Sequence, residues 1–518
     1  MPLARWFEGT VRVAGAPRVH ARSVTAAQWR DAAQAVAAQG GRLLSIWSQG
    51  AIGAEHSVIA AFMADPGVLL LELPVSESNG HDRVDYPGLQ DLFPAASRLQ
   101  RALADLSGLR CDDPDGRPWL RHAAWPATFR PLRDRVPPAS APQPASAAGS
   151  YAFVRVEGDG VHEVPVGPVH AAVIEPGHFR FSVVGEKVLR LEQRFGYAHK
   201  GIERRFSELP LRDGQRLAAR ISGDSAVAYS WAYCQALEGL AGTPVPARAL
   251  WLRALALELE RIANHLGDLG ALGNDAGFAF ALAQFSRLKE QLLRTLEGAL
   301  GQRYLMDFIV PGGTRCDLTA QGSAALLATL AAVADEAGRL RSILEQHEGV
   351  RDRFVGSGTL TASLARRLGV TGLAGRASGQ GHDLRIDLPW PPYHELSVAL
   401  QVRSEGDVAA RVAVRFDELA ESCRLARVIL ERLPVGAHRE VYAEPGAGAV
   451  GVGLIEGWRG PVMIVLEAGA AGAVRRCHAH DSSWQNWPAI EHAVMDNIIA
   501  DFPLINKSFN LAYSAHDL

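Results

Sequence analysis

The first 75 residues combine one helical pattern with three short β-favouring runs. Thr25 opens a capping-box signature completed by Gln28, and two glycines at 40–41 stop the Ala-rich helix that follows. The β-favouring runs, each bounded by glycine or proline signals, are residues 42–47, 56–62 and 68–73. This order predicts an antiparallel meander packed on helices, which is a small α+β domain.

Residues 137–150 contain only proline, alanine, serine, glutamine and glycine. Such a segment has no large apolar side chain to bury and too many prolines for a helix or strand. It predicts an interdomain linker, which divides the chain into a domain at 1–136 and a larger domain at 151–518.

The larger domain begins with strands and continues with helices. Residues 151–166 and 178–191 alternate apolar and polar side chains, and Gly185-Glu186 breaks the second run as a hairpin turn would. Apolar side chains then recur at spacings of three and four in residues 247–267, 284–300, 323–348 and 407–433. A Gly-rich β-like stretch follows at 446–465. The pattern predicts an α+β fold, in which a mainly helical bundle carries a peripheral β-sheet.

Composition narrows the class of protein. The chain has 518 residues, 48% of them hydrophobic, and a formal net charge of -3, which lacks the positive field that nucleic-acid binding needs. Arg5 and Glu8 stand where a signal peptide would have its apolar core, which favours a cytoplasmic location. The most apolar helical stretch, residues 324–334, is too short for the roughly 20 residues that cross a bilayer. The chain is therefore expected not to span a membrane, although it can lie against one.

Neither a metal motif nor a nucleotide motif is evident. The five cysteines are too far apart for a CxxC motif or a paired disulfide framework. They are Cys111, Cys234, Cys316, Cys423 and Cys477. His478 and His480 beside Asp481 are interpreted as surface or interface residues, because catalytic zinc sites need three protein ligands. The glycines at 446–453 lack both the G-x-G-x-x-G order and a P-loop lysine.

Polar side chains gather at three places. On the helix at 247–267, Glu258, Arg261 and His265 fall near one face, which predicts a solvated or interhelical polar face. Residues 177–180 and 196–204 combine charged side chains with glycines, as a functional site or a charged turn does.

In chain order, six segments resemble the successive blocks of one family. They are residues 167–170, 175–180, 196–203, 222–225, 260–266 and 453–460. The family is the large subunit shared by energy-converting nickel-iron hydrogenases, formate hydrogenlyase and respiratory complex I. The first domain, at residues 86–94 and 105–109, is similar to the small complex I subunit that some members fuse to the large one. The resemblance covers nearly the whole chain.

The family's nickel and iron are held by four thiolates in two blocks, because soft sulfur ligands suit these metals. At the matching positions this sequence has Ser222, Ser225, Ala512 and Ala515. Alanine has no donor atom, and a serine hydroxyl is a hard, protonated oxygen. Cys234 lies nine residues beyond Ser225 and is interpreted as a buried small apolar side chain. We therefore expect no metal and no cofactor to be held by this chain itself.

The large subunit of complex I likewise resembles a hydrogenase that lost its metal, and it uses the vacated cavity to reduce quinone. Asp275 follows His265 at the spacing where complex I places a carboxylate near the quinone head group. His178 lies two residues from the position of the histidine beside the quinone. The resemblance makes His178 and Asp275 candidate proton donors and quinone a candidate ligand.

The resemblance also predicts a non-autonomous subunit of the peripheral arm, inactive in isolation, in an oxidoreductase complex on the inner face of the cell membrane. It implies an iron-sulfur small subunit docked against the region of Ser222 and Asp275, and antiporter-like membrane subunits. Any NADH chemistry belongs to other subunits of the family. An inert scaffold remains an alternative, and the missing thiolates argue against an active nickel-iron hydrogenase.

Overall fold

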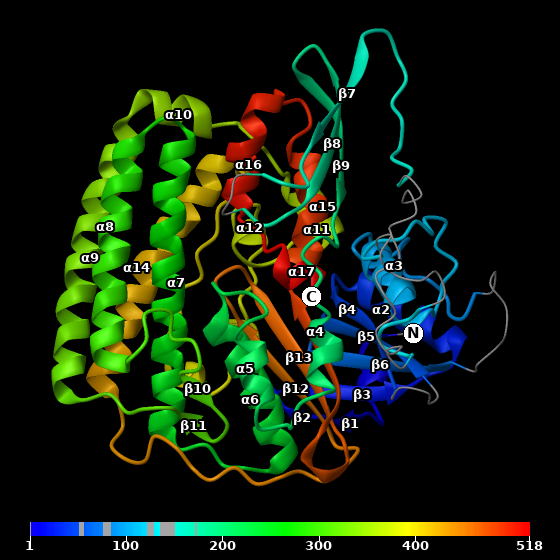
Figure 1. Cartoon of the computed structure of the whole chain (residues 1–518), viewed down its shortest axis with the longest axis vertical. Coiled ribbons are helices and arrows are strands. Elements are labelled where there is room, and N and C mark those ends of the chain that lie inside the picture. The colour runs from blue at the N-terminus through cyan, green and yellow to red at the C-terminus, as the bar shows by residue number, and fades with distance from the viewer. Residues whose placement is uncertain (1, 51–55, 76–83, 122–128, 135–150, 171–173) are drawn as a thin grey trace, which may run out of the picture.

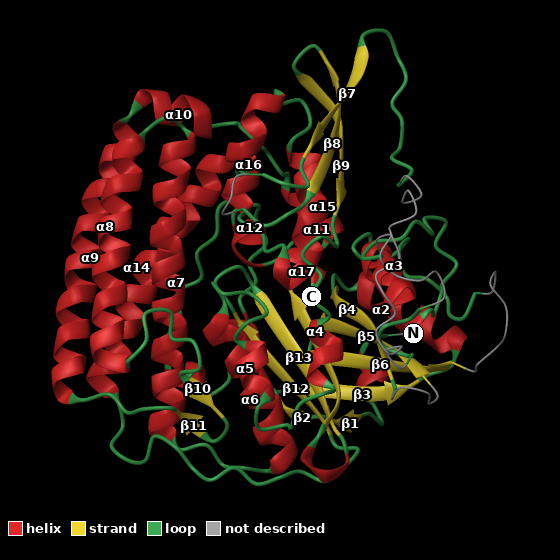
Figure 2. Ribbon diagram, in the orientation of Figure 1, coloured by secondary structure: helices red, strands yellow, loops and turns green. Residues whose placement is uncertain are grey.

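The computed structural model describes residues 2–50, 56–75, 84–121, 129–134, 151–170 and 174–518. Long helices lie on one side of the molecule, and the sheet of the N-terminal domain lies on the other (Figures 1 and 2). A second sheet runs between them. The α+β prediction is confirmed.

The N-terminal domain contains a five-stranded sheet in the order β1-β3-β6-β5-β4. Its strands are β1 (Val11–Arg12), β3 (Val19–Ser23), β4 (Arg42–Gln49), β5 (His56–Ala64) and β6 (Gly67–Val75). β4, β5 and β6 form the expected antiparallel meander. β3, which the sequence pattern did not indicate, pairs in parallel with β6.

Two helices pack in this domain, α2 (Ala26–Ala38) and α3 (Ala96–Ser107). Both halves of the capping box form at the start of α2: the Thr25 hydroxyl accepts from the Gln28 backbone N–H, and the Gln28 side chain accepts from the Thr25 N–H. Two backbone N–H groups at the start of the helix, which have no partner within the helix, thus bond to nearby side chains. α2 begins where the pattern predicts.

The second sheet joins the two domains. Its order is β14-β13-β12-β2, with β2 (Ala14–Gly15), β12 (Val450–Glu456), β13 (Pro461–Ala468) and β14 (Val474–Asp481). β2 comes from the N-terminal domain and pairs in parallel with β12. The beginning of the chain is therefore anchored in the sheet of the larger domain, which the division at residue 136 did not foresee.

The glycines of β12 let a helix lie directly on the strand. A Cβ at Gly453 would be 1.7 Å from the Ala232 carbonyl oxygen, and one at Gly451 would be 2.6 Å from the Ala236 oxygen. Both carbonyls belong to α6 (Ala226–Ala241). The Gly-rich stretch thus serves close packing of helix on sheet.

Four long helices form the bundle at the left of Figure 1: α7 (Ala247–Asp275), α8 (Ala279–Leu300), α9 (Ala320–Gln346) and α14 (Val408–Arg432). α7 packs against both α8 and α14, so most of its side chains are buried. Within the described part of the chain, no helix is both long and apolar enough to cross a bilayer.

A three-stranded antiparallel sheet stands at the top of Figure 1. It consists of β7 (Val161–Val166), β8 (His178–Val184) and β9 (Lys187–Arg194). Gly185-Glu186 makes the turn between β8 and β9, as predicted. Residues 151–157, which were expected to extend the first strand, lie outside any strand.

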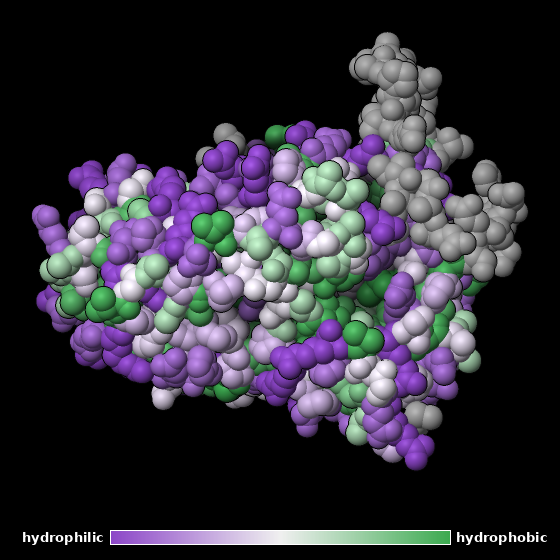
Figure 3. All heavy atoms as spheres, turned by 90° about the horizontal axis from the view of Figure 1, so that it is seen from below, coloured by the Kyte–Doolittle hydropathy of each residue, from purple (hydrophilic) through white to green (hydrophobic). Residues whose placement is uncertain are grey.

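The remaining helices are short. They are α1 (Ala4–Phe7), α4 (Ile202–Phe206), α5 (Gly214–Ala218), α10 (Glu348–Phe354), α11 (Ala362–Leu368), α12 (Gly372–Arg376), α13 (Leu384–Asp387), α15 (Ser483–Ala493), α16 (Phe502–Phe509) and α17 (Ser514–Asp517). A small hairpin is formed by β10 (Ile309–Val310) and β11 (Gly313–Thr314). The segment between α14 and β12 crosses the underside of the molecule, where Val435 and Val441 are exposed. Figure 3 looks onto that underside and shows apolar side chains gathered among polar ones.

Candidate functional site

Residues 222–225 form the loop that leads into α6, and their polar groups converge on one carboxylate. The Ser222 hydroxyl donates to Asp224 Oδ1 at 2.6 Å. Arg459, in the turn between β12 and β13, donates Nη1 to the same oxygen at 2.9 Å and Nη2 to Asp224 Oδ2. Its Nη1 also lies 3.4 Å from Ser225 Oγ. Arg459 and Asp224 therefore form a two-pronged ion pair over the start of α6.

The segment that follows α16 reaches the same arginine. Arg459 Nε donates to the Asn510 carbonyl at 2.5 Å, and the Asn510 amide donates to Asp268 Oδ1 at 2.6 Å. The Ala512 N–H donates to Ser483 Oγ at 3.0 Å. We call this meeting of residues 222–225, Arg459 and residues 510–512 the Arg459 junction. It joins the two segments that the sequence singled out.

The charges of the Arg459 junction are matched. Burial by itself would raise the pKa of Asp224, but the Arg459 guanidinium and the Ser222 hydroxyl bring that pKa below its usual value. The Asp224 side chain keeps 37% of its surface exposed, whereas that of Arg459 keeps 5%. The ion pair thus has one buried end and one end near solvent.

No thiol belongs to this junction. Cys234 lies further along α6, where burial raises the pKa of its thiol, and Cys423 on α14 has its pKa raised to about 12. Cys477 lies on β14 beside Glu203. In the described ranges no three His, Cys, Asp or Glu side chains are grouped so as to hold a metal ion. Hydroxyls, a paired carboxylate and a guanidinium do not suit a soft metal such as low-valent nickel.

The two candidate proton donors belong to different elements. His178 begins β8, and its Nδ1 lies 3.2 Å from the Gly167 carbonyl oxygen. Burial lowers its pKa, and Arg180 adds to that effect. Asp275 ends α7, where partial burial raises its pKa and Lys507 opposes the rise. Over the described residues neither hydrogen bond nor ion pair joins the two side chains, so their assignment as a pair stays a prediction.

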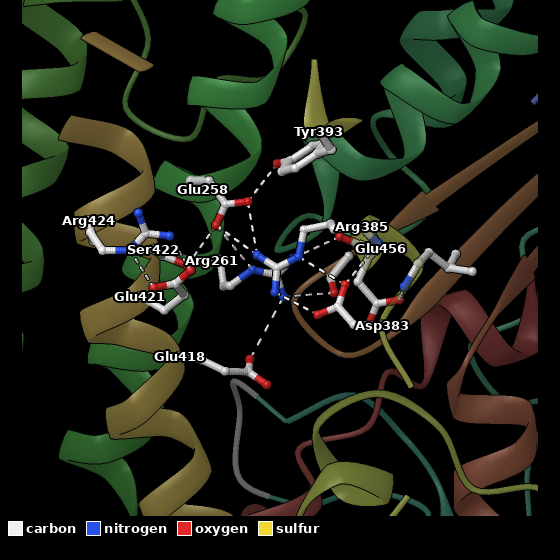
Figure 4. A network of polar contacts seen from close by, with 12 residues as sticks. Glu258, Arg261, Asp383, Arg385, Tyr393, Glu418, Glu421, Ser422, Arg424 and Glu456 are labelled. Atoms are coloured by element: carbon white, nitrogen blue, oxygen red, sulfur yellow. Dashed lines mark hydrogen bonds and ion pairs between the residues drawn. The ribbon is translucent and has the colours of Figure 1, made fainter. Parts of the chain in front are cut away.

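Deep in the bundle, the polar face of α7 belongs to a large buried ionic cluster (Figure 4). Glu258 accepts from Arg385 at 3.0 and 3.1 Å, from the Tyr393 hydroxyl at 2.6 Å and from Ser422 at 2.7 Å. Arg385 also pairs with Asp383 at 2.7 Å. Each of these side chains is almost wholly buried. The predicted polar face is interhelical, and no part of it is solvated.

A second arginine extends the cluster. Arg376 donates to Glu418 at 2.7 Å and to Glu456 at 2.8 Å. His265 Nε2 lies 3.0 Å from Glu418, and burial lowers the pKa of this histidine, so its neutral ring donates to the carboxylate. We call this set the Glu258 network: Glu258, Arg261, His265, Arg376, Asp383, Arg385, Glu418 and Glu456.

The Glu258 network has four carboxylates but only three arginines. Arginine charges bring the pKa values of Glu258 and Glu418 below their usual range, despite burial. Burial and the charge of Asp383 raise the pKa of Glu456 to about 7. Glu456 is therefore the member that holds a proton near neutral pH.

Sequence spacing singled out only three of the eight members of this network, Glu258, Arg261 and His265. Arg376 ends the short helix α12, and Asp383 and Arg385 lie at the start of the short helix α13. These short helices show no apolar period, and Arg385 is 127 residues from Glu258. Arg459 stood inside a family segment but was not singled out as a site residue. The only signal for it was its place in a charged turn next to glycines.

The histidines of β14 bind the domains together. The His478 ring lies 2.5 Å from Glu203 at Nδ1 and 2.9 Å from Ser45 Oγ at Nε2, and it stacks on Trp47. His480 pairs with Gln485 at 3.0 Å. Both histidines are buried, so the interface interpretation holds for His478 and the surface alternative is wrong for both.

Proteins similar to this chain are subunits of oxidoreductase complexes. Residues 275–447 match the model of the family "Respiratory-chain NADH dehydrogenase, 49 Kd subunit". Formate hydrogenlyase subunit 5 of Escherichia coli is 30% identical over 440 residues, which cover 84% of this chain and 77% of that protein. The C/D fusion protein of the NADH-quinone oxidoreductase of Bacteroides fragilis is 27% identical over 465 residues, covering 84% and 86%.

A solved structure has the same fold. It belongs to the membrane-bound sulfane sulfur reductase, an archaeal respiratory membrane complex, and it matches with a TM-score of 0.65 and 24% identity over 69% of this chain and 98% of that one. The chain belongs to the family of large subunits that formate hydrogenlyase, membrane-bound hydrogenases and complex I share.

Proposed function

We propose that this chain is a peripheral subunit of a membrane-bound oxidoreductase complex and carries no nickel-iron site. An adjacent iron-sulfur subunit delivers electrons, and antiporter-like membrane subunits use the energy. The chain lies on the cytoplasmic side, held to the membrane by its partners. The names of its relatives support this placement, since they are components of formate hydrogenlyase and NADH-quinone oxidoreductase.

The Arg459 junction carries the proposal. It holds Ser222, Ser225 and Ala512, three of the four positions at which the family resemblance predicts thiolates, and Ala515 follows in α17. In place of soft donors, the junction has hydroxyls and the ion pair of Arg459 with Asp224, and the third donor nitrogen of Arg459 is taken by the Asn510 carbonyl. A guanidinium so placed neutralises the carboxylate and repels a cation.

A hydrogen-uptake assay tests the proposed absence of a nickel-iron site directly. We expect the purified complex to show no hydrogen-dependent reduction of a viologen dye, while it transfers electrons from its natural donor to an acceptor. Hydrogen-dependent reduction that co-purifies with this chain would refute the proposal.

The acceptor that we propose is quinone, with His178 and Asp275 as proton donors. Asp275 has a raised pKa and a half-buried position, both of which suit proton transfer. In the intact complex we expect Asp275→Asn to lower quinone reduction at least tenfold. Asp335→Asn, on the exposed face of α9, is the matched control and should leave the rate unchanged.

An inert scaffold is the alternative outcome of the same experiment. Asp275→Asn and His178→Asn would then leave turnover intact. The Glu258 network is the observation that favours a structural role, because its arginines and carboxylates pair with one another inside the bundle.

A further inference from the structure

A cavity of about 410 Å³ opens between α7 and α8, on the outer side of the Arg459 junction. Toward the end of α7 the two helices pack closely, because Gly270 and Gly273 face Phe285 and Ala281 without a side chain between them. Below Gly267 this close contact gives way to the cavity, and the segment at 303–306 forms its third wall. The volume is within the range of small-molecule sites.

One wall of the cavity is apolar. Leu259 of α7 and Leu293 and Leu296 of α8 line it together. The three leucines are buried within the bundle, so they supply a preformed surface for an apolar body.

The inner wall carries two polar side chains with hydrogen-bonding capacity to spare. Glu260 accepts from the Val227 and Ala228 backbone N–H groups at 2.7 and 3.2 Å, at the start of α6. The Asn264 amide donates to the carbonyls of Asp224 and Glu260 at 2.8 and 2.9 Å, and its Oδ1 accepts nothing from the described residues. Both residues line the cavity.

The lining also includes a cation that has no counter-ion among the described residues. Lys289 lies over the α7 backbone, where a Cβ at Gly267 would be 2.9 Å from its ammonium nitrogen. Across the described residues Lys289 makes neither a hydrogen bond nor an ion pair. Arg303, the other cation of the cavity, pairs with Glu290 at 2.6 Å. Lys289 therefore leaves an uncompensated positive charge in the lining of the cavity.

We propose that this cavity binds a small organic carboxylate. Its charged group pairs with Lys289, its apolar body lies against Leu259, Leu293 and Leu296, and a polar group at the far end meets Glu260 and Asn264. The site requires no redox chemistry, so it stands or falls independently of the proposed function.

The proposal includes a pH dependence. Burial and the charge of Asp224 raise the pKa of Glu260 to about 8, against the two backbone N–H groups and Arg261, which lower it. Lys289 and Arg303 are the cations that line the same cavity. Below pH 8 Glu260 is neutral and does not repel an anion. Above pH 8 Glu260 becomes a carboxylate anion and repels the anionic ligand, so the affinity for the ligand falls.

Titration calorimetry with the purified full-length chain tests the site, with hexanoate as the probe and hexan-1-ol as its neutral match. At pH 7 we expect hexanoate to bind at least fivefold more tightly. Lys289→Met removes that preference, and Leu293→Trp, which fills the cavity, abolishes binding of both probes. Lys187→Met, which removes an exposed lysine on β9, changes nothing.

The pH series separates the Glu260 contribution. Hexanoate affinity in the unmodified chain should fall about tenfold between pH 7 and 9, whereas in Glu260→Gln it should stay constant. Circular dichroism of each variant confirms folding. Equal binding of hexanoate and hexan-1-ol, hexanoate binding unaffected by Lys289→Met, or no binding of either probe would overturn the proposal.

Discussion

The Arg459 junction and the Glu258 network both place arginine against carboxylates, but they differ in their surroundings. In the network, Glu258 and Arg385 expose 0% and 3% of their side chains and lie among packed helices. In the junction, Asp224 exposes 37% and sits on a loop that precedes a helix. The first set is shielded from water, whereas the second meets it at one end.

This difference in exposure to water determines how costly it is to break each set of ion pairs. A buried ion pair loses hydration and must be compensated by its partners, so breaking it is costly and its arrangement is fixed. A pair near solvent is held more weakly, because water replaces part of any lost contact. Loss of one partner should therefore cost less at the Arg459 junction than in the Glu258 network, which lies inside the bundle.

Removing Arg385 should have the largest effect. Arg385→Met leaves Glu258 and Asp383 without their main counter-ion in a buried setting. We expect the free energy of unfolding to fall by about 3–5 kcal/mol. Urea denaturation followed by circular dichroism measures this, and a loss under about 1 kcal/mol would contradict the account of the network.

Glu456→Gln should change how stability depends on pH. The pKa of Glu456 is raised in the folded chain, so between its unfolded value near 4.5 and about 7 only the unfolded state releases the proton. Stability from this group is complete below pH 4.5 and is lost as pH rises to 7. The glutamine variant should lack this loss, which is on the order of 3 kcal/mol.

The slope of unfolding free energy between pH 5 and 7 is the measurement for Glu456→Gln, since the substitution also shifts the baseline. One Glu456 oxygen accepts from Arg376 and the other accepts from the Leu384 N–H. In glutamine one of these oxygens is replaced by an NH₂ group, which cannot accept a hydrogen bond. Identical slopes in the two proteins would mean that the network holds its proton elsewhere.

Arg459→Met should cost less than Arg385→Met. The substitution removes the counter-ion of Asp224, but water already reaches that carboxylate. We expect a loss of about 1–2 kcal/mol in urea denaturation of the full-length chain. A loss as large as that of Arg385→Met would erase the distinction between the two regions.

The smallest effect belongs to an exposed pair on the surface of the bundle. Arg339 and Asp335 are one turn apart on α9, and both are 69% exposed. Arg339→Met should change stability by less than about 0.5 kcal/mol. The same denaturation series checks it and sets the scale for the buried substitutions.

Local features of the fold were predictable because a few neighbouring residues determine them. The capping box at Thr25 and the two-residue turn at Gly185 both form where the sequence places them. The meander of the first domain follows from its short β-favouring runs between glycine and proline signals, and the long helices follow from apolar periodicity. α7 nevertheless runs eight residues past the predicted end at 267, because Gly270 and Gly273 pack against α8 instead of ending the helix.

Long-range pairing was not predictable. β2 is two residues long and pairs with a strand more than 400 positions away, so no local sequence pattern indicates this strand. Arg385 meets Glu258 only because two distant segments fold together. At the candidate site the family resemblance located both segments of the junction. The ion pair of Arg459 with Asp224 could not be predicted, because its two residues are far apart in the sequence and meet only in the folded chain.

The central claim is the proposal that this chain carries no nickel-iron site, because hydroxyls and an ion pair stand where the family resemblance predicts thiolates. Inductively coupled plasma mass spectrometry of the purified complex tests it most directly, with nickel counted against this chain and iron counted separately for the iron-sulfur partner. We predict less than about 0.1 nickel per chain, since the junction offers no soft donors. One nickel per chain would contradict the account.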